Sequence, residues 1–128
     1  MSIKFLLGII RHAPHRERFI NSLVLNDDSA TIITENYYEI IKELGTIILL
    51  IDGFKTIGEY AHKEIIESLD KYANFNTEEI SVLQDLRIRR NNSMYEGKQT
   101  EPSYLKNYKN FLLKIIDKLK NIIGNELK

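Results

Sequence analysis

The segment 102–122, PSYLKNYKNFLLKIIDKLKNI, decides the fold class of this 128-residue chain. Its apolar residues recur at intervals of three and four, which places them on one face of an α-helix. That stripe consists of Leu105, Tyr108, Leu112, Ile115, Ile116, Leu119 and Ile122. Pro102 suits the first turn of a helix, where a backbone N–H is not needed. Most lysines of the segment lie off the stripe, so we predict an amphipathic helix with one solvated face.

The same spacing dominates upstream, and no alternating strand pattern persists. It predicts helices over 14–25, 29–51, 57–73 and about 76–95. In the first, one side carries Phe19, Ile20, Leu23 and Val24. The second should be buried on more than one side, through Ile33, Tyr37, Ile40, Ile41, Leu44, Ile47 and Ile48. We therefore predict a single all-α domain over 1–128, an up-and-down bundle of four to five helices.

Several helix ends carry recognisable signals. In NDDS, at 26–29, Asp or Ser oxygens are expected to accept the free amides that begin the second helix. Asn76 and Glu79 have the spacing of a capping box for the fourth helix. Gly97 is expected to end that helix.

Composition narrows the class of protein. Hydrophobic residues make up 43% and charged residues 28% of the chain, with 18 basic and 18 acidic residues. This balance argues against a strongly basic nucleic-acid-binding surface but allows a local basic patch. There is no cysteine, and neither a signal peptide nor a membrane span is indicated. We expect a cytoplasmic protein with no membrane partner and no cofactor.

The segment LQDLRIRRNNSMYEGK, at 83–98, departs from a plain bundle helix. On a helical wheel, Arg90 falls inside the arc formed by apolar residues such as Leu83 and Leu86. The same end of the helix gathers Arg87, Arg90, Asn91 and Tyr95. Burying a guanidinium without a partner costs several kcal/mol, so this arginine needs an explanation.

Three interpretations of Arg90 are open. Its aliphatic stem covers apolar surface while the charge reaches water. Alternatively, it pairs with a carboxylate of a neighbouring helix, for which Glu35, Glu39 and Glu43 are candidates. In the third interpretation it lines a cleft, often between subunits, and binds a phosphate through two N–H groups.

RRNNSMYEG, at 89–97, resembles the signature of the HEPN domain (higher eukaryotes and prokaryotes nucleotide-binding), an arginine, a polar residue, three variable positions and a histidine. Here Arg90 and Asn91 are followed by Asn92, Ser93 and Met94, and Tyr95 stands in place of the histidine. The segment 29–69 is similar to the family's long second helix, its Gly-containing turn and its short third helix. The resemblance covers most of the chain from Ser29 onward.

The resemblance implies a nucleotide- or RNA-binding protein related to toxin-type, metal-independent ribonucleases that act as homodimers. Arg90 would contact the phosphate, Asn91 would orient Arg90 or the ligand, and Arg87 is a second phosphate candidate. Tyr95 takes the place of a catalytic histidine, but a phenol with a pKa near 10 is a poor base at neutral pH. It can still bond a phosphate or stack on a base. Weak endoribonuclease activity that uses Arg90 and Tyr95 therefore stays open.

Two alternatives of another kind also stay open. One is a non-enzymatic interaction module, in which Arg90 and Tyr95 build an interface. The other, implied by the same resemblance, is a partner or substrate of a minimal nucleotidyltransferase in a toxin–antitoxin pair.

The N-terminal segment GIIRHAPHRER, at 8–18, is a weaker indication of function. It superficially resembles the Arg-His segment of histidine phosphatases. The histidines at 12, 15 and 62 are expected to be structural or surface residues, so no metal site is predicted.

Overall fold

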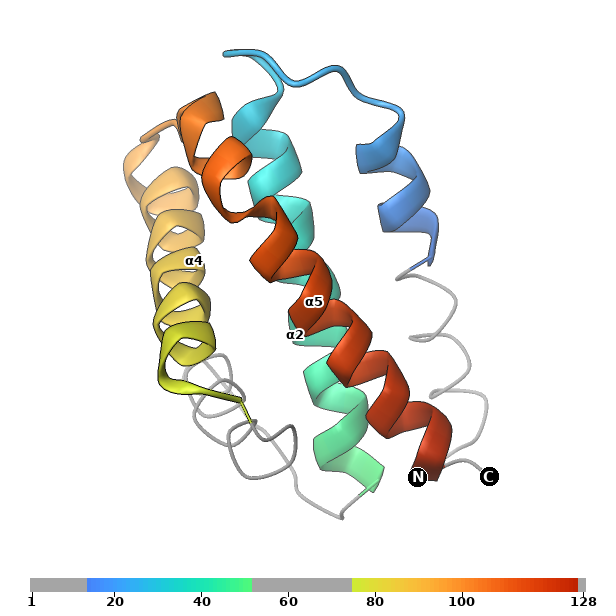
Figure 1. Cartoon of the computed structure of the whole chain (residues 1–128). Helices are drawn as coiled ribbons and strands as arrows, with labels where there is room; N and C mark the ends of the chain where they lie inside the picture. Colours follow the sequence, from blue (N-terminus) through green and yellow to red (C-terminus); the bar gives the residue numbers. More distant parts are fainter. Residues whose placement is uncertain (1–13, 52–74, 127–128) are drawn as a thin grey trace.

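The computed structural model describes residues 14–51 and 75–126. All regular structure within these ranges is helical: a short helix over 14–21, α2 (Ala30–Ile51), α4 (Thr77–Glu96) and α5 (Pro102–Glu126) (Figure 1). The predicted all-α bundle is confirmed for this part of the chain. The predicted helix over 57–73 lies outside the described residues.

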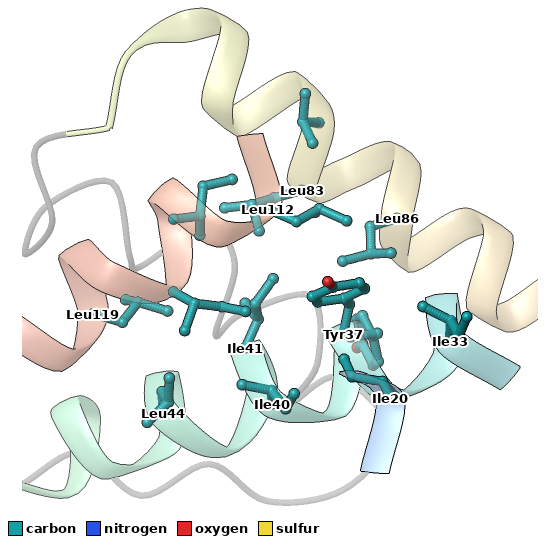
Figure 2. Close-up of a cluster of buried hydrophobic side chains, with 14 of the residues drawn as sticks. Ile20, Ile33, Tyr37, Ile40, Ile41, Leu44, Leu83, Leu86, Leu112 and Leu119 are labelled. Atoms are coloured by element: carbon teal, nitrogen blue, oxygen red, sulfur yellow. The ribbon is translucent and has the colours of Figure 1, made fainter. Parts of the chain in front are cut away.

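In the bundle, α2 packs against both α4 and α5. As Figure 1 shows, α2 and α5 run in the same direction, α4 runs the opposite way, and the helix over 14–21 lies on the other side of α2. The core forms where these helices face one another. In Figure 2, Tyr37 and Ile41 of α2 point toward Leu83 of α4 and Leu112 of α5.

Helix α2 is the most deeply buried element, as its wide apolar face predicted. Every residue of the predicted apolar set is buried, and the helix buries Tyr38 and Thr34 as well. A helix that is apolar over so much of its circumference needs partners on several sides. This explains its central position between the other described helices.

The start of α2 differs from the prediction. No aspartate of this described segment accepts the free amides; instead Asn26 Oδ1 accepts hydrogen bonds from the backbone N–H groups of Asp28 and Ser29, each at 2.9 Å. Ser29 Oγ accepts from the backbone N–H of Asn26 at 3.0 Å, and the same hydroxyl donates to the carbonyl oxygen of Val24. An asparagine side chain can hold a turn in this way because its amide oxygen reaches backbone amides two and three residues on.

The first helix is shorter than predicted, ending at residue 21 rather than 25. The Ser22 hydroxyl donates to the carbonyl oxygen of Phe19 at 2.6 Å, and the chain turns there. Of the predicted apolar side, only Ile20 is fully buried, and Leu23 is partly buried against the core. Phe19 and Val24 are exposed.

Helix α4 begins and ends as predicted. Asn76 Oδ1 accepts from the Glu79 N–H at 2.8 Å, and Glu79 Oε1 accepts from the Asn76 N–H at 3.2 Å, which completes the capping box. At the other end, Gly97 adopts the left-handed conformation, with φ of 67°. Its N–H bonds the carbonyl oxygen of Ser93 at 3.2 Å. These caps set the length of the helix that carries Arg90.

Helix α5 begins at Pro102 and buries most of its predicted stripe. The prediction that Tyr108 belongs to the buried stripe was wrong, because this residue is 38% exposed. Its ring centroid lies 5.2 Å from that of Tyr104. Tyr104, which the stripe omitted, is buried. The buried aromatic residue near the start of α5 is therefore Tyr104, one turn before Tyr108.

Candidate functional site

The Arg90 side chain lies between α4 and α2 and is only 13% exposed. Its Nη2 atom is 3.5 Å from Oε1 of Glu39, and the guanidinium lies 5.4 Å from the ring centroid of Tyr38. Both partners belong to α2. The antiparallel arrangement of the two helices brings this end of α4 to the middle of α2.

Most of the hydrogen-bonding capacity of Arg90 is unused within the described part of the chain. Its Nη1 donates to Oδ1 of the adjacent Asn91 at 3.3 Å. Its Nε–H is buried and has no hydrogen-bond partner among the described residues. Since a guanidinium carries five N–H donors, the site holds a cation with spare donors close to the protein surface.

Of the three predicted carboxylate partners, Glu39 is the one that pairs with Arg90. Glu35 accepts a hydrogen bond from the Ser93 hydroxyl of α4, whereas Glu43 pairs with Arg16 of the first helix at 3.0 Å. Glu39 also lies 2.9 Å from Nζ of Lys42, one turn along α2. It therefore stands between two cations.

The ring of Tyr38 packs beside the guanidinium of Arg90. Burial raises the pKa of Tyr38 to about 12, and the charge of Arg90 opposes that rise while Glu39 adds to it. The phenol is consequently neutral near pH 7. It offers Arg90 an aromatic surface without adding a second negative charge.

The other predicted site residues lie on the outward flank of the same helix. Arg87 is partly buried, and its Nε donates to Oε1 of Gln84 at 3.1 Å. Tyr95 is 77% exposed. Arg90 and Asn91 are thus in direct contact, while Arg87 and Tyr95 border them on the surface of α4.

A second polar cluster on α4 was not predicted. Arg89 lies 3.0 Å from Oδ2 of Asp85 and 3.2 Å from Oε1 of Glu101, and its guanidinium is 4.1 Å from the ring centroid of Tyr104. The four-residue spacing of Asp85 and Arg89 was a signal for part of it. Because Arg89 contacts Asp85 of its own helix as well as Glu101 and Tyr104, the cluster ties α4 to the start of α5.

Of the three histidines that could be considered as metal ligands, only His15 lies within the described residues. His15 is exposed and contacts Arg18, while the histidines at 12 and 62 lie outside the described ranges. No group of three or more His, Cys, Asp or Glu side chains in 14–51 and 75–126 is arranged to hold a metal ion.

Comparisons of this chain with protein-family models, with curated proteins and with solved structures find no match. No helix in the described part of the chain combines the length and apolar character needed to cross a membrane. The resemblance to HEPN domains thus rests on the residues quoted above.

Proposed function

We propose that this chain is a HEPN-like nucleotide- or RNA-binding protein, related to the toxin-type metal-independent ribonucleases, whose motif is degenerate at Tyr95. The observation that carries the proposal is the state of Arg90, a largely buried guanidinium with incompletely used donors. The helical bundle and the position of the motif at the end of α4 are compatible with it.

The contact with Glu39 is too long to satisfy Arg90. Charge-assisted hydrogen bonds between a guanidinium and a carboxylate are typically about 2.7–2.9 Å long, whereas the Nη2–Oε1 distance is 3.5 Å. A buried cation held this loosely gains from a second anion, and a phosphate can accept two parallel N–H bonds from a guanidinium. A purely structural arginine would be expected to bond its carboxylate more closely.

Neighbouring residues suit roles around a bound phosphate. Asn91 holds one edge of the Arg90 guanidinium at 3.3 Å and so orients it. Arg87 supplies a second cation on the same flank of α4. Tyr95, which is largely exposed, offers a ring on which a base can stack. In-line attack by a ribose 2′-hydroxyl would still need a proton acceptor, a role for which a tyrosine is poorly suited at neutral pH.

The proposal is tested by RNA binding and RNA cleavage in EDTA. Arg90→Ala should weaken binding of a fluorescent single-stranded RNA and lower the slope of log affinity against log salt by about 0.7, the contribution of one phosphate contact on a single strand. The variant is expected to fold, because Glu39 keeps Lys42 as a partner at 2.9 Å. Arg90→Lys should restore the positive charge but not the two parallel N–H bonds that a guanidinium can donate to a phosphate.

Lys106→Ala is the matched control. Lys106 is exposed on α5, so its replacement removes one positive charge without touching the candidate site. Equal weakening by Arg90→Ala and Lys106→Ala would mean that only net charge matters, and the proposed site would be rejected. Wild-type protein that binds no RNA and cleaves none would reject the function itself.

A second function, a protein interface, is favoured by the exposed apolar side chains of α4. Ile88 is 48% exposed, Met94 is 56% exposed and Tyr95 is 77% exposed. Exposed apolar side chains that form a contiguous patch commonly mark an interface, and a homodimer through this helix would bring two copies of the motif together. Met94→Asp should then shift the sedimentation coefficient from dimer to monomer, whereas Leu113→Asp, on the exposed side of α5, should not.

A further inference from the structure

We propose that Glu39 is a built-in competitor for the anion at Arg90, and that Lys42 keeps its carboxylate when a phosphate replaces the contact with Arg90. The inference rests on the proposed function, since it describes how the same site is regulated. It assigns a role to two α2 residues that lie outside the motif at the end of α4.

The geometry of the three charges supports this exchange. Oε1 of Glu39 faces Nη2 of Arg90 at 3.5 Å, and Oε2 of the same carboxylate lies 2.9 Å from Nζ of Lys42. One carboxylate thus bridges two cations, and its closer partner is the lysine. The arginine contact is the longer of the two and is the one that a bound phosphate would replace, leaving the lysine contact in place.

Burial distinguishes the two cations. The Arg90 side chain is 13% exposed, whereas that of Lys42 is 27% exposed and that of Glu39 is 21% exposed. Arg90 therefore depends more on a nearby anion, because a poorly hydrated charge gains more from being neutralised. Glu39 supplies that anion when no phosphate is bound, and it keeps the site from being an unpaired buried charge.

The other two acidic residues along this side of α2, Glu35 and Glu43, contact groups other than Arg90. Glu35 accepts from Ser93, and Glu43 pairs with Arg16 at 3.0 Å while leaving one buried oxygen without a partner. Glu39 is the only one of these three carboxylates that contacts Arg90 within the described residues. A phosphate that contacts the guanidinium therefore competes directly with one of these three carboxylates, that of Glu39.

The consequence is that removing this charge should tighten anion binding. Glu39→Gln keeps the size and the hydrogen-bonding oxygen of the side chain but removes the competing charge. The competing charge is partly exposed, so its removal should raise the affinity for RNA by a modest factor, about three- to tenfold. Lys42→Met should have the opposite effect, because Glu39 then has only Arg90 as a partner.

The experiment measures the anisotropy of a fluorescein-labelled, mixed-sequence, single-stranded RNA at fixed salt for each variant. Glu43→Gln is the matched control, because it removes the same charge one turn further along the same helix. We expect Glu39→Gln to bind more tightly than both wild type and Glu43→Gln. The double variant Glu39→Gln with Arg90→Ala should lose the gain, and unfolding curves in urea check that each variant is folded.

The two proposals fail in different ways. If wild type binds RNA through Arg90 and Glu39→Gln binds no more tightly than wild type or Glu43→Gln, the competition is overturned and the proposed function survives. If neither wild type nor Glu39→Gln binds RNA, the proposed function is overturned and the competition falls with it. Tighter binding by Glu39→Gln that persists without Arg90 also overturns the competition.

Discussion

Lys118 of α5 reaches across to the first turn of α4, where its Nζ donates to Oε1 of Glu79 at 2.6 Å. The same oxygen closes the capping box with Asn76, and the Glu79 side chain is only 1% exposed. A local helix-start signal is therefore also a tertiary contact. It joins the helix that carries Arg90 to α5, the most amphipathic of the labelled helices that the structure describes.

This relationship predicts a pH-dependent stability. Burial by itself would raise the pKa of Glu79, but the hydrogen bonds from Lys118 and from the Asn76 backbone outweigh it and hold the pKa below its ordinary value of 4.5. A lowered pKa means that the stabilisation is present above the unfolded-state value and is lost as pH falls through the folded-state value. Glu79→Gln should cost about 1–2 kcal/mol of unfolding free energy at pH 7.

The measurement is urea unfolding of wild type and Glu79→Gln between pH 7 and pH 3. The difference between the two should shrink below about pH 4.5, because protonated Glu79 has already lost its charge. Glu78→Gln serves as control, since Glu78 is exposed and adjacent. A difference that stays constant across this range would contradict the role of the charge.

A second pH dependence is expected on the alkaline side. Burial raises the pKa of Tyr38 to about 12, above the ordinary value of 10.0. Because the folded state holds the phenolic proton more tightly than the unfolded chain, stability should be full below pH 10 and should fall between pH 10 and about 12. Tyr38→Phe should reduce the fall in that part of the profile in unfolding experiments, while Tyr37 and Tyr104, whose pKa values burial also raises, keep contributing to it. Parallel profiles for the two proteins would rule out this contribution.

Two glycines should respond in opposite directions to the same change. Gly97 has a φ of 67°, so Gly97→Ala should destabilise the protein by about 1 kcal/mol through backbone strain, although the new methyl group would meet no atom. Gly124 lies within α5 and is also surrounded by open space. Gly124→Ala should stabilise by up to about 1 kcal/mol, because alanine loses less backbone entropy in a helix. Thermal unfolding of both variants checks the signs.

Adjacent leucines of α5 test the orientation of that helix. Leu112 is fully buried in the core of Figure 2, whereas Leu113 is 39% exposed. Leu112→Ala should lower the unfolding free energy by about 2–5 kcal/mol through lost burial and a cavity. Leu113→Ala should change it by about 0.5 kcal/mol or less. Comparable losses at both positions would mean that the helix is rotated relative to the structure.

Tyr95→His tests whether the site can support catalysis. The side chain is 77% exposed, so the replacement should not affect folding. A histidine exchanges protons near neutral pH and can serve as a general base, which typically contributes about 10²–10⁴-fold to rate. We expect EDTA-resistant RNA cleavage to increase in Tyr95→His and to disappear when Arg90→Ala is added. Unchanged cleavage in Tyr95→His would argue for a binding or interface role instead.

Local chemistry explains which predictions from the sequence were confirmed. The capping box of Asn76 and Glu79, the stop at Gly97 and the start at Pro102 all depend on bonds or backbone preferences within a few residues. The predicted buried set of α2 was confirmed for the same reason, since helical periodicity is a property of the chain itself. At the turn before α2, where Asn26 and Ser29 accept from each other's backbone N–H groups, local reasoning named the wrong acceptor for the amides that begin the helix.

Only the tertiary structure decided what surrounds Arg90. The sequence placed this arginine in an apolar arc and offered three carboxylates, but the choice of Glu39 depends on how α2 and α4 are rotated and shifted against each other. Packing of side chains between helices sets that rotation. The same cause exposes Tyr108, buries Tyr104 and unites Arg89 with Glu101. Periodicity thus determined which helices form, and interhelical packing determined which charges meet.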